Sequence, residues 1–355
     1  MRLREIDFIR ALAALSVIAI HITASYVSDT TLGRAWNEIM RYAVPLFIIL
    51  SGFVLFNSER GRSPLSYLQF QRKRMGKVLI PYVLWTLLYV LYIARQFLRD
   101  NGWEGIPRLY SPTLDHLYYG TAFYHLYFLI ITFQLYLLYP LLRDAMIRKP
   151  QWLLGGSFLV TAFAQTAAYM HWDLGWRITF FPHWLFFFVF GMYFAQNLES
   201  WRAKLSGRAG WIGLVWLGSL GLLFLDGYLS DKWAYSVKPS VMLYTLLSFL
   251  FFYAVFLRVA ETKRVWGKMF DWLSAQSFLI FLLHPLVLNL MGNQLKKYGY
   301  GELFDGSFGM VMMYLLVTLV TCLLTWIASF VPLTVPFGGV YRKKKTNNKP
   351  RSLQA

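Results

Sequence analysis

Ten runs of about 20 apolar residues constrain this 355-residue chain more than any other feature. A helix needs roughly 20 such residues to cross a hydrocarbon layer of about 30 Å. Backbone polar groups in lipid must bond within their own segment, and none of the runs alternates with the two-residue period of a strand. The sequence therefore predicts an all-α fold, a polytopic membrane bundle of about ten transmembrane helices. The expected spans are 8–28, 38–56, 78–97, 122–142, 152–170, 178–195, 211–228, 241–257, 274–292 and 308–331.

The net charge of +18 is explained by where the charges fall between these spans. With the N-terminus placed in the cytoplasm, 24 of the 35 Lys and Arg residues lie in cytoplasmic segments and 10 in outer segments, while Arg10 lies within a span. An excess of Lys and Arg on the cytoplasmic side is the usual signature of membrane topology. We therefore expect both termini in the cytoplasm, the lipid bilayer as a partner, and no nucleic-acid binding. The longest segment between spans is too short for a second domain, so we expect one membrane domain over 1–335 and a basic cytoplasmic tail over 336–355.

Arg10 and His21 lie eleven residues apart in the first span. At 100° per residue, this spacing places both side chains on one face of a helix, about 16 Å apart along its axis. The small residues Ala13, Ala14 and Val17 share the face between them, and they either leave a groove or let a neighbouring helix approach closely. An ionisable residue inside a span usually faces water or protein, which makes His21 a candidate functional residue. A neutral His bonded to a neighbouring hydroxyl is the structural alternative.

Four further segments accompany this pair. Residues 44–53 read VPLFIILSGF, residues 72–82 read RKRMGKVLIPY, residues 124–129 read YHLYFL, and residues 277–285 read SFLIFLLHP. Together with the Arg and His of the first span, they resemble the bacterial acyltransferase 3 family of membrane proteins over nearly the whole chain. Two positions depart from the family pattern. Lys77 stands where Arg is common, and Tyr127 stands where Trp is common. Lys can still bind a phosphate, but as a point charge without a bidentate fork.

The resemblance implies a transmembrane acyltransferase domain in the bacterial cytoplasmic membrane. Such an enzyme would move an acyl group, usually acetyl, from cytoplasmic acetyl-CoA or another acyl-CoA to a hydroxyl or amine of an envelope polysaccharide or lipid-linked glycan. Acyl-CoA would be a co-substrate, and no bound cofactor is expected. A separate glycan-synthesis or acceptor protein could be a further partner.

The residues of the first hairpins suit this chemistry. Arg10, Arg72, Arg74 and Lys77 are expected at the cytoplasmic mouth, where charge-assisted bonds to the phosphates of the donor would be strong. A groove from there to His21 would bring the thioester beside the imidazole. An unperturbed His pKa of about 6.5 suits a general base that removes the proton of the acceptor hydroxyl. A covalent acyl-imidazole intermediate is the alternative, and the sequence does not separate the two.

Other residues are secondary candidates. His125 is a second catalytic candidate that could orient the substrate or polarise the thioester oxygen. Ser51, Tyr124 and His284 are candidates for substrate contact or for a structural role, and simple packing is as consistent for His125 and His284. Since no carboxylate or thiol lies near a His at ligand spacing, no metal site is expected.

The main alternative is a transporter or flippase that exports a polysaccharide or lipid-linked sugar. Proteins of polysaccharide-export loci resemble the same family, and a bundle with intramembrane His residues would serve export as well. The alignment of Arg10 with His21 favours the enzyme, because it suits a donor channel and export requires no such pair. A purely structural scaffold would leave these residues and the basic 72–77 segment without a joint purpose.

Overall fold

The computed structural model describes residues 3–61, 65–262 and 264–341. Within these ranges the chain contains helices and no strand, which confirms the all-α prediction. Short 3-10 segments join several of the helices, as in η4 (Phe181–His183) and η5 (Gly301–Phe304). The α-helices are α1 (Arg4–Thr23), α2 (Thr31–Ile39), α3 (Ala43–Glu59), α4 (Tyr67–Asn101), α5 (Tyr110–Tyr119), α6 (Tyr127–Arg148), α7 (Pro150–Tyr169), α8 (Leu185–Gln196), α9 (Leu198–Leu205), α10 (Ala209–Ser230), α11 (Pro239–Thr262), α12 (Arg264–Lys297) and α13 (Gly306–Ala328).

Eight helical segments of the described chain are long and apolar enough to cross a membrane. They correspond to the expected spans except the fifth and sixth. The fifth is present as α7, a helix of 20 residues. The sixth is shortened to the apolar helix α8, of 12 residues, because the chain is not α-helical before Leu185. The prediction of a polytopic helical bundle is therefore confirmed. Two of the ten expected spans, the fifth and the sixth, are not among the eight segments long and apolar enough to cross a membrane.

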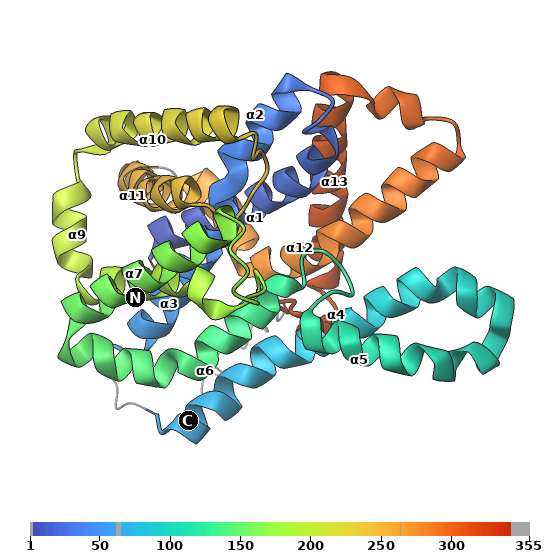
Figure 1. Ribbon diagram of the computed structural model, residues 1–355, viewed down its shortest axis with the longest axis horizontal. Coiled ribbons are helices and arrows are strands. Elements are labelled where there is room, and N and C mark those ends of the chain that lie inside the picture. The colour runs from blue at the N-terminus through green and yellow to red at the C-terminus, as the bar shows by residue number, and fades with distance from the viewer. Residues whose placement is uncertain (1–2, 62–64, 263, 342–355) are drawn as a thin grey trace, which may run out of the picture.

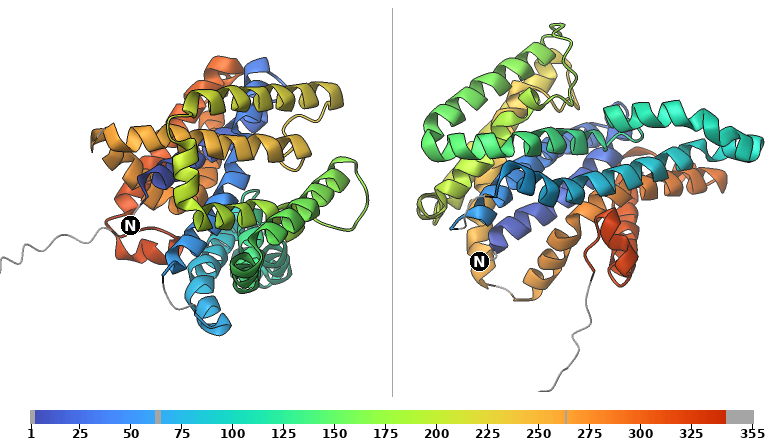
Figure 2. Two further views of the ribbon diagram at one scale, coloured as in Figure 1. Left: turned by 90° about the vertical axis from the view of Figure 1, so that its left-hand side faces the viewer. Right: turned by 90° about the horizontal axis from the view of Figure 1, so that it is seen from below.

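Helix α1 lies at the centre of the bundle. It packs against α3, α11, α12 and α13, and its apolar side chains belong to both clusters of the core (Figure 1). Helices α4 and α5 form a hairpin that projects at one end of the bundle (Figure 2, right). Because α1 touches so many neighbours, most of its side chains are buried.

Local sequence signals set the ends of the projecting hairpin. Ser66 begins α4 with a capping box, in which its hydroxyl accepts from the Gln69 N–H and the Gln69 side chain accepts from the Ser66 N–H. Gly120 ends α5 at a positive φ of 69°, a conformation that glycine adopts without strain. Residues 121–126 after this turn form no helix, and α6 begins at Tyr127. Tyr124 and His125 consequently lie in a turn, not within the helix expected over 122–142.

The first residues of the expected tail contact the helices. The Trp85 indole N–H donates to the Phe337 carbonyl at 3.0 Å. The Gln276 side chain forms a pair of hydrogen bonds with the backbone of Val340, at 2.9 and 3.1 Å. Residues 336–340 thus belong to the bundle, and residues 342–355 of the predicted tail lie outside the described residues.

Two glycines allow α3 and α8 to cross with their backbones in contact. A Cβ on Gly52 would lie 2.0 Å from the Phe188 carbonyl oxygen, and a Cβ on Gly191 would lie 2.0 Å from that of Ile49. Close backbone approach at small residues is a main source of helix association in lipid. The crossing fixes α3, whose Ser51 and Phe47 reach the site described below.

We expect Gly191→Val to destabilise the bundle, because the added carbons would force α3 and α8 apart. Overpacking of this kind costs roughly 1–3 kcal/mol. Thermal unfolding of the detergent-solubilised protein should show a lower midpoint. Gly218→Val in α10 is the matched control, since no heavy atom lies within 4 Å of the position that a Cβ would take there; an equal effect of both changes would contradict the role of the crossing.

Candidate active site

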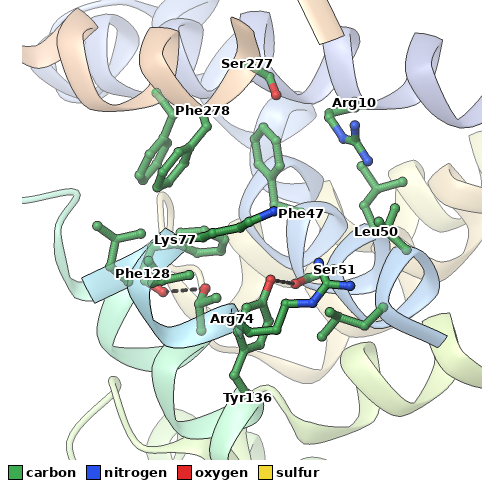
Figure 3. Close-up of a pocket in the computed structure, with 16 residues that line it drawn as sticks. Arg10, Phe47, Leu50, Ser51, Arg74, Lys77, Phe128, Tyr136, Ser277 and Phe278 are labelled. Atoms are coloured by element: carbon green, nitrogen blue, oxygen red, sulfur yellow. Dashed lines mark hydrogen bonds between the residues drawn. The ribbon is translucent and has the colours of Figure 1, made fainter. Parts of the chain in front are cut away.

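A first cavity, named here the basic cavity, lies between α1, α3, α4, α6 and α12 and has a volume of about 260 Å³. Figure 3 shows Arg10, Arg74 and Lys77 reaching toward it from two different helices. The remaining wall is mostly apolar, with aromatic rings of α3, α6 and α12. The polar residues that line it, apart from the cations, are Ser51, Thr132, Tyr136 and Ser277.

Three of the four predicted donor-binding cations meet at this cavity. Arg10 is held by α12 and by its own helix, with Nη1 3.5 Å from the Ser274 hydroxyl and 3.7 Å from the Asp7 carboxylate. Arg72 is exposed and does not line the cavity. The spacing from Arg74 to Lys77 places both on one side of α4, whereas Arg72 points elsewhere on the helix.

Two hydrogen bonds fix the floor of the basic cavity. Arg74 donates from Nη2 to the Ser58 hydroxyl at 3.0 Å, and its buried Nε has no partner among the described residues. The Ser51 and Tyr136 hydroxyls are 3.0 Å apart (Figure 3). Guanidinium N–H groups suit phosphate or another anion, and the cavity presents them beside an apolar wall.

A second cavity, the histidine cavity, has a volume of about 410 Å³. His21 and Tyr124 line it, with their ring centroids 4.6 Å apart. The cavity extends along the C-terminal part of α12 and reaches η5. Among the described residues, none lines both cavities.

A layer of aromatic rings lies between the two cavities. Phe281 lines the basic cavity, and its ring centroid is 5.2 Å from that of His125 and 6.2 Å from that of His284. The His284 ring in turn stacks on His21 at 5.3 Å. The structure therefore brings together all three predicted His residues, and it places His284, ranked last by sequence, in direct contact with His21.

The ring nitrogens of this layer are poorly paired. His284 Nδ1 lies 3.0 Å from the Ile280 carbonyl, which can only accept, so Nδ1 bears a hydrogen and Nε2 carries the lone pair of the neutral ring. Neither nitrogen of His125, nor Nε2 of His284, has a hydrogen-bond partner in the described part of the chain. Buried polar atoms are normally bonded, and unpaired ones concentrate where a ligand or water completes them.

The direct groove expected along α1 is not open. Arg10 and His21 both face α12, as their spacing predicts, through Ser274 and His284. Between them, however, Ala14 packs in a core cluster with residues of α12, and Ala13 and Val17 are also buried. The small residues allow close helix approach, the second of the two outcomes considered for them, and the approaching helix fills the space.

A buried charge network supports the turn that carries His21. Asn37 donates to the Ile20 carbonyl at 3.0 Å, at the end of α1, and accepts from Arg41. Arg41 also donates to the Ser236 hydroxyl at 3.0 Å and interacts electrostatically with His21. The network thus connects the segment before α3 to the last turns of α1.

Two carboxylates balance the cations of this network. Lys238 is fully buried, with its Nζ 3.7 Å from a Glu38 oxygen and 3.5 Å from an Asp226 oxygen. Glu38 also accepts from the Ala234 N–H at 2.6 Å. Sequence analysis singled out neither Arg41, which lies in the expected span 38–56, nor Lys238, which lies between two expected spans. The signal that could have revealed them is an acidic and a basic residue, Glu38 and Arg41, three apart at the start of an apolar span.

These features describe a multi-pass membrane protein with a cavity lined by three cations next to a cluster of His residues. A family model described as an acyltransferase domain, acyltransferase 3, matches residues 3–330. The chain belongs to this family and is a membrane acyltransferase.

Two kinds of relative are similar along most of their length. "Putative membrane-bound acyltransferase YfiQ" of Bacillus subtilis is 25% identical over 307 residues, which are 80% of each chain. "Probable poly-beta-1,6-N-acetyl-D-glucosamine export protein" of Staphylococcus aureus is 23% identical over 343 residues, 89% of this chain and 88% of the relative. No solved structure is significantly similar to the chain.

We expect Lys238→Met to destabilise the protein strongly, because Glu38 and Asp226 would lose their buried partner. Breaking a buried ion pair from one side costs roughly 3–5 kcal/mol. Thermal unfolding in detergent measures the loss, and Lys149→Met at an exposed position should have little effect. Adding Glu38→Gln to Lys238→Met should restore part of the stability. A double variant as unstable as the sum of the two single variants would contradict the coupling.

Proposed function

We propose that this acyltransferase moves an acyl group, in the simplest case acetyl, from acyl-CoA to a hydroxyl or amine of an envelope polysaccharide or lipid-linked glycan, with His21 as general base. The observation that carries the proposal is the arrangement of the two cavities. One presents three cations beside an apolar wall, the other contains His21, and one layer of rings lies between them.

The basic cavity suits the donor. Arg10, Arg74 and Lys77 can bind phosphate groups of CoA, and the exposed Arg72 could contact the donor only outside the cavity. The apolar wall, including Phe278, favours the thin pantetheine arm and the acyl chain. The distribution of Lys and Arg supports a cytoplasmic location of this cavity and of both termini in a bacterial cytoplasmic membrane.

The transfer step uses a neutral His21. Its ring nitrogen removes the proton of the acceptor O–H or N–H while the acceptor atom attacks the thioester carbonyl carbon. The carbon–sulfur bond breaks, CoA leaves as the thiolate, and the proton on His21 passes to that sulfur. His284, with its lone pair on Nε2, and the unpaired His125 can orient the thioester or carry the proton across the layer.

The thioester reaches His21 only if the ring layer opens. Phe281 is the member of that layer that lines the donor side, so a change in its side-chain rotamer would admit the acyl group. A closed layer keeps water away from the thioester until the acceptor is in place. This replaces the groove expected along α1 with a crossing through the His cluster.

Export of the glycan is the competing function, favoured by the name of the Staphylococcus aureus relatives. The same two cavities could belong to a transport path. A set of cations lining a cavity next to a His cluster has a direct use in acyl transfer from an anionic donor, whereas movement of an uncharged glycan needs no such cations. A separate acceptor or glycan-synthesis protein could deliver the glycan in either case.

We expect purified protein in lipid vesicles to transfer radiolabel from [acetyl-14C]acetyl-CoA to added envelope glycan. His21→Ala should reduce the rate at least 100-fold, the lower range for loss of a general base. His183→Ala is the control, since this buried His lines neither cavity. Glycan that crosses the vesicle membrane unlabelled would favour export, and full turnover by His21→Ala would remove His21 from the mechanism.

We expect Arg74→Glu to raise the KM for acyl-CoA by roughly tenfold or more, because losing a charge-assisted bond costs about 1.5–3 kcal/mol. Steady-state kinetics over a range of acyl-CoA concentrations measures this effect. Lys73→Glu makes the same change in charge at the neighbouring exposed position, outside the cavity. Equal changes in KM would mean that the segment acts only through its overall charge.

A further inference from the structure

The histidine cavity has a polar lining that the donor reaction does not use. Its wall carries Asn289, Asn293 and Lys296 of α12, and Asp29 and Asp305 from segments outside α12. All five side chains are exposed, and all but Asn289 lie just beyond the ends of the expected spans, where a hydrophilic ligand can reach them from water. The volume of about 410 Å³ lies in the range of small-molecule sites.

The two asparagines are held in place and still have bonding capacity. The Tyr92 hydroxyl donates to Asn289 Oδ1 at 2.9 Å, and Asn293 Nδ2 donates to the same oxygen at 3.1 Å. Among the described residues, no protein group bonds Asn289 Nδ2 or Asn293 Oδ1. One free donor and one free acceptor, four residues apart on one helix face, match the hydroxyl groups of a sugar.

The charges around the cavity select against anions. Asp29 and Asp305 contribute two carboxylates, and Lys296 contributes one cation. With a neutral His21 the lining is net negative, so it disfavours a carboxylate or phosphate and tolerates an amine. This pattern is opposite to that of the basic cavity, where three cations gather.

We infer that the histidine cavity is the acceptor subsite: it holds one sugar unit through Asn289 and Asn293, beside His21, and selects neutral or amine-bearing sugars over anionic ones. The inference rests on the proposed acyl transfer and specifies the acceptor of that reaction. Sugar bound there has its hydroxyls on the His21 side of the ring layer, while the donor occupies the other side.

A glycine gives a direct way to block the subsite. Gly292 lines the cavity within α12, and no heavy atom lies within 4 Å of the Cβ that a larger residue would have there. A Trp at this position would project into the cavity without displacing the helix. Gly155 of α7 has equally open surroundings and lines neither cavity, so Gly155→Trp is the matched control.

The first experiment measures binding without acyl-CoA. Titration calorimetry of the purified full-length protein uses three β-linked disaccharides, built from N-acetylglucosamine, glucosamine or glucuronic acid. We expect the first two to bind the wild-type protein and Gly155→Trp at least tenfold more tightly than the third, and Gly292→Trp to lose this binding. Any of three results would overturn the inference. They are an affinity for the glucuronic acid disaccharide equal to that for the other two, unchanged binding by Gly292→Trp, and no binding of any of the three disaccharides.

The second experiment measures label transfer from acetyl-CoA to the same disaccharides. Gly292→Trp should raise the KM for the sugar at least tenfold and leave the KM for acetyl-CoA unchanged. The double variant Asp29→Asn with Asp305→Asn should reduce the difference in KM between the glucuronic acid disaccharide and the other two. If the wild-type protein binds sugar but transfers no label, the result counts against the proposed enzyme reaction and not against the subsite. If Gly292→Trp transfers label with an unchanged KM for the sugar, the result refutes the subsite alone.

Discussion

The close contact of α1 with α12 is the interaction on which the arrangement of the site depends. Ala11 and Ala14 present almost no side chain, so α12 approaches α1 and fills the space between Arg10 and His21. The two helices carry matching pairs of groups, Arg10 with Ser274 and His21 with His284, about three turns apart. This contact separates the protein interior into two cavities of opposite charge character.

The buried charged groups near the end of α1 are paired. Lys238 lies between Glu38 and Asp226, and Asn37 fastens Arg41 to the end of α1. Buried charges are costly in an apolar bundle unless compensated, and this network is charge-balanced. In the described part of the chain, the ring nitrogens of the His layer and the Nε of Arg74, next to the cavities, are among the buried atoms without partners. Their missing partners are consistent with ligands completing the site.

The length of the apolar runs was sufficient to predict the all-α bundle, and helix periodicity was sufficient to predict the shared face of Arg10 and His21. It could not predict that the groove between them is closed, because that depends on α12, whose Ser274 is 264 residues from Arg10 in the sequence. The placement of Tyr124 and His125 in a turn follows from the positive φ at Gly120, a local feature within an apolar run that otherwise suits a helix. Arg41 and Lys238 were not singled out because charges near span ends usually reflect topology, and only their distant partners distinguish them.

Separation of the cavities has a chemical consequence for a transferase. If donor and acceptor shared one open channel, water could reach the thioester from the acceptor side and hydrolyse it. In the proposed reaction, with Phe281, His125 and His284 between the cavities, the acyl group would cross only one layer of rings, and the proton would travel the opposite way through the same imidazoles. The layer that blocks a direct route would thus also bring the proposed base and the thioester within reach of each other once a single ring moves.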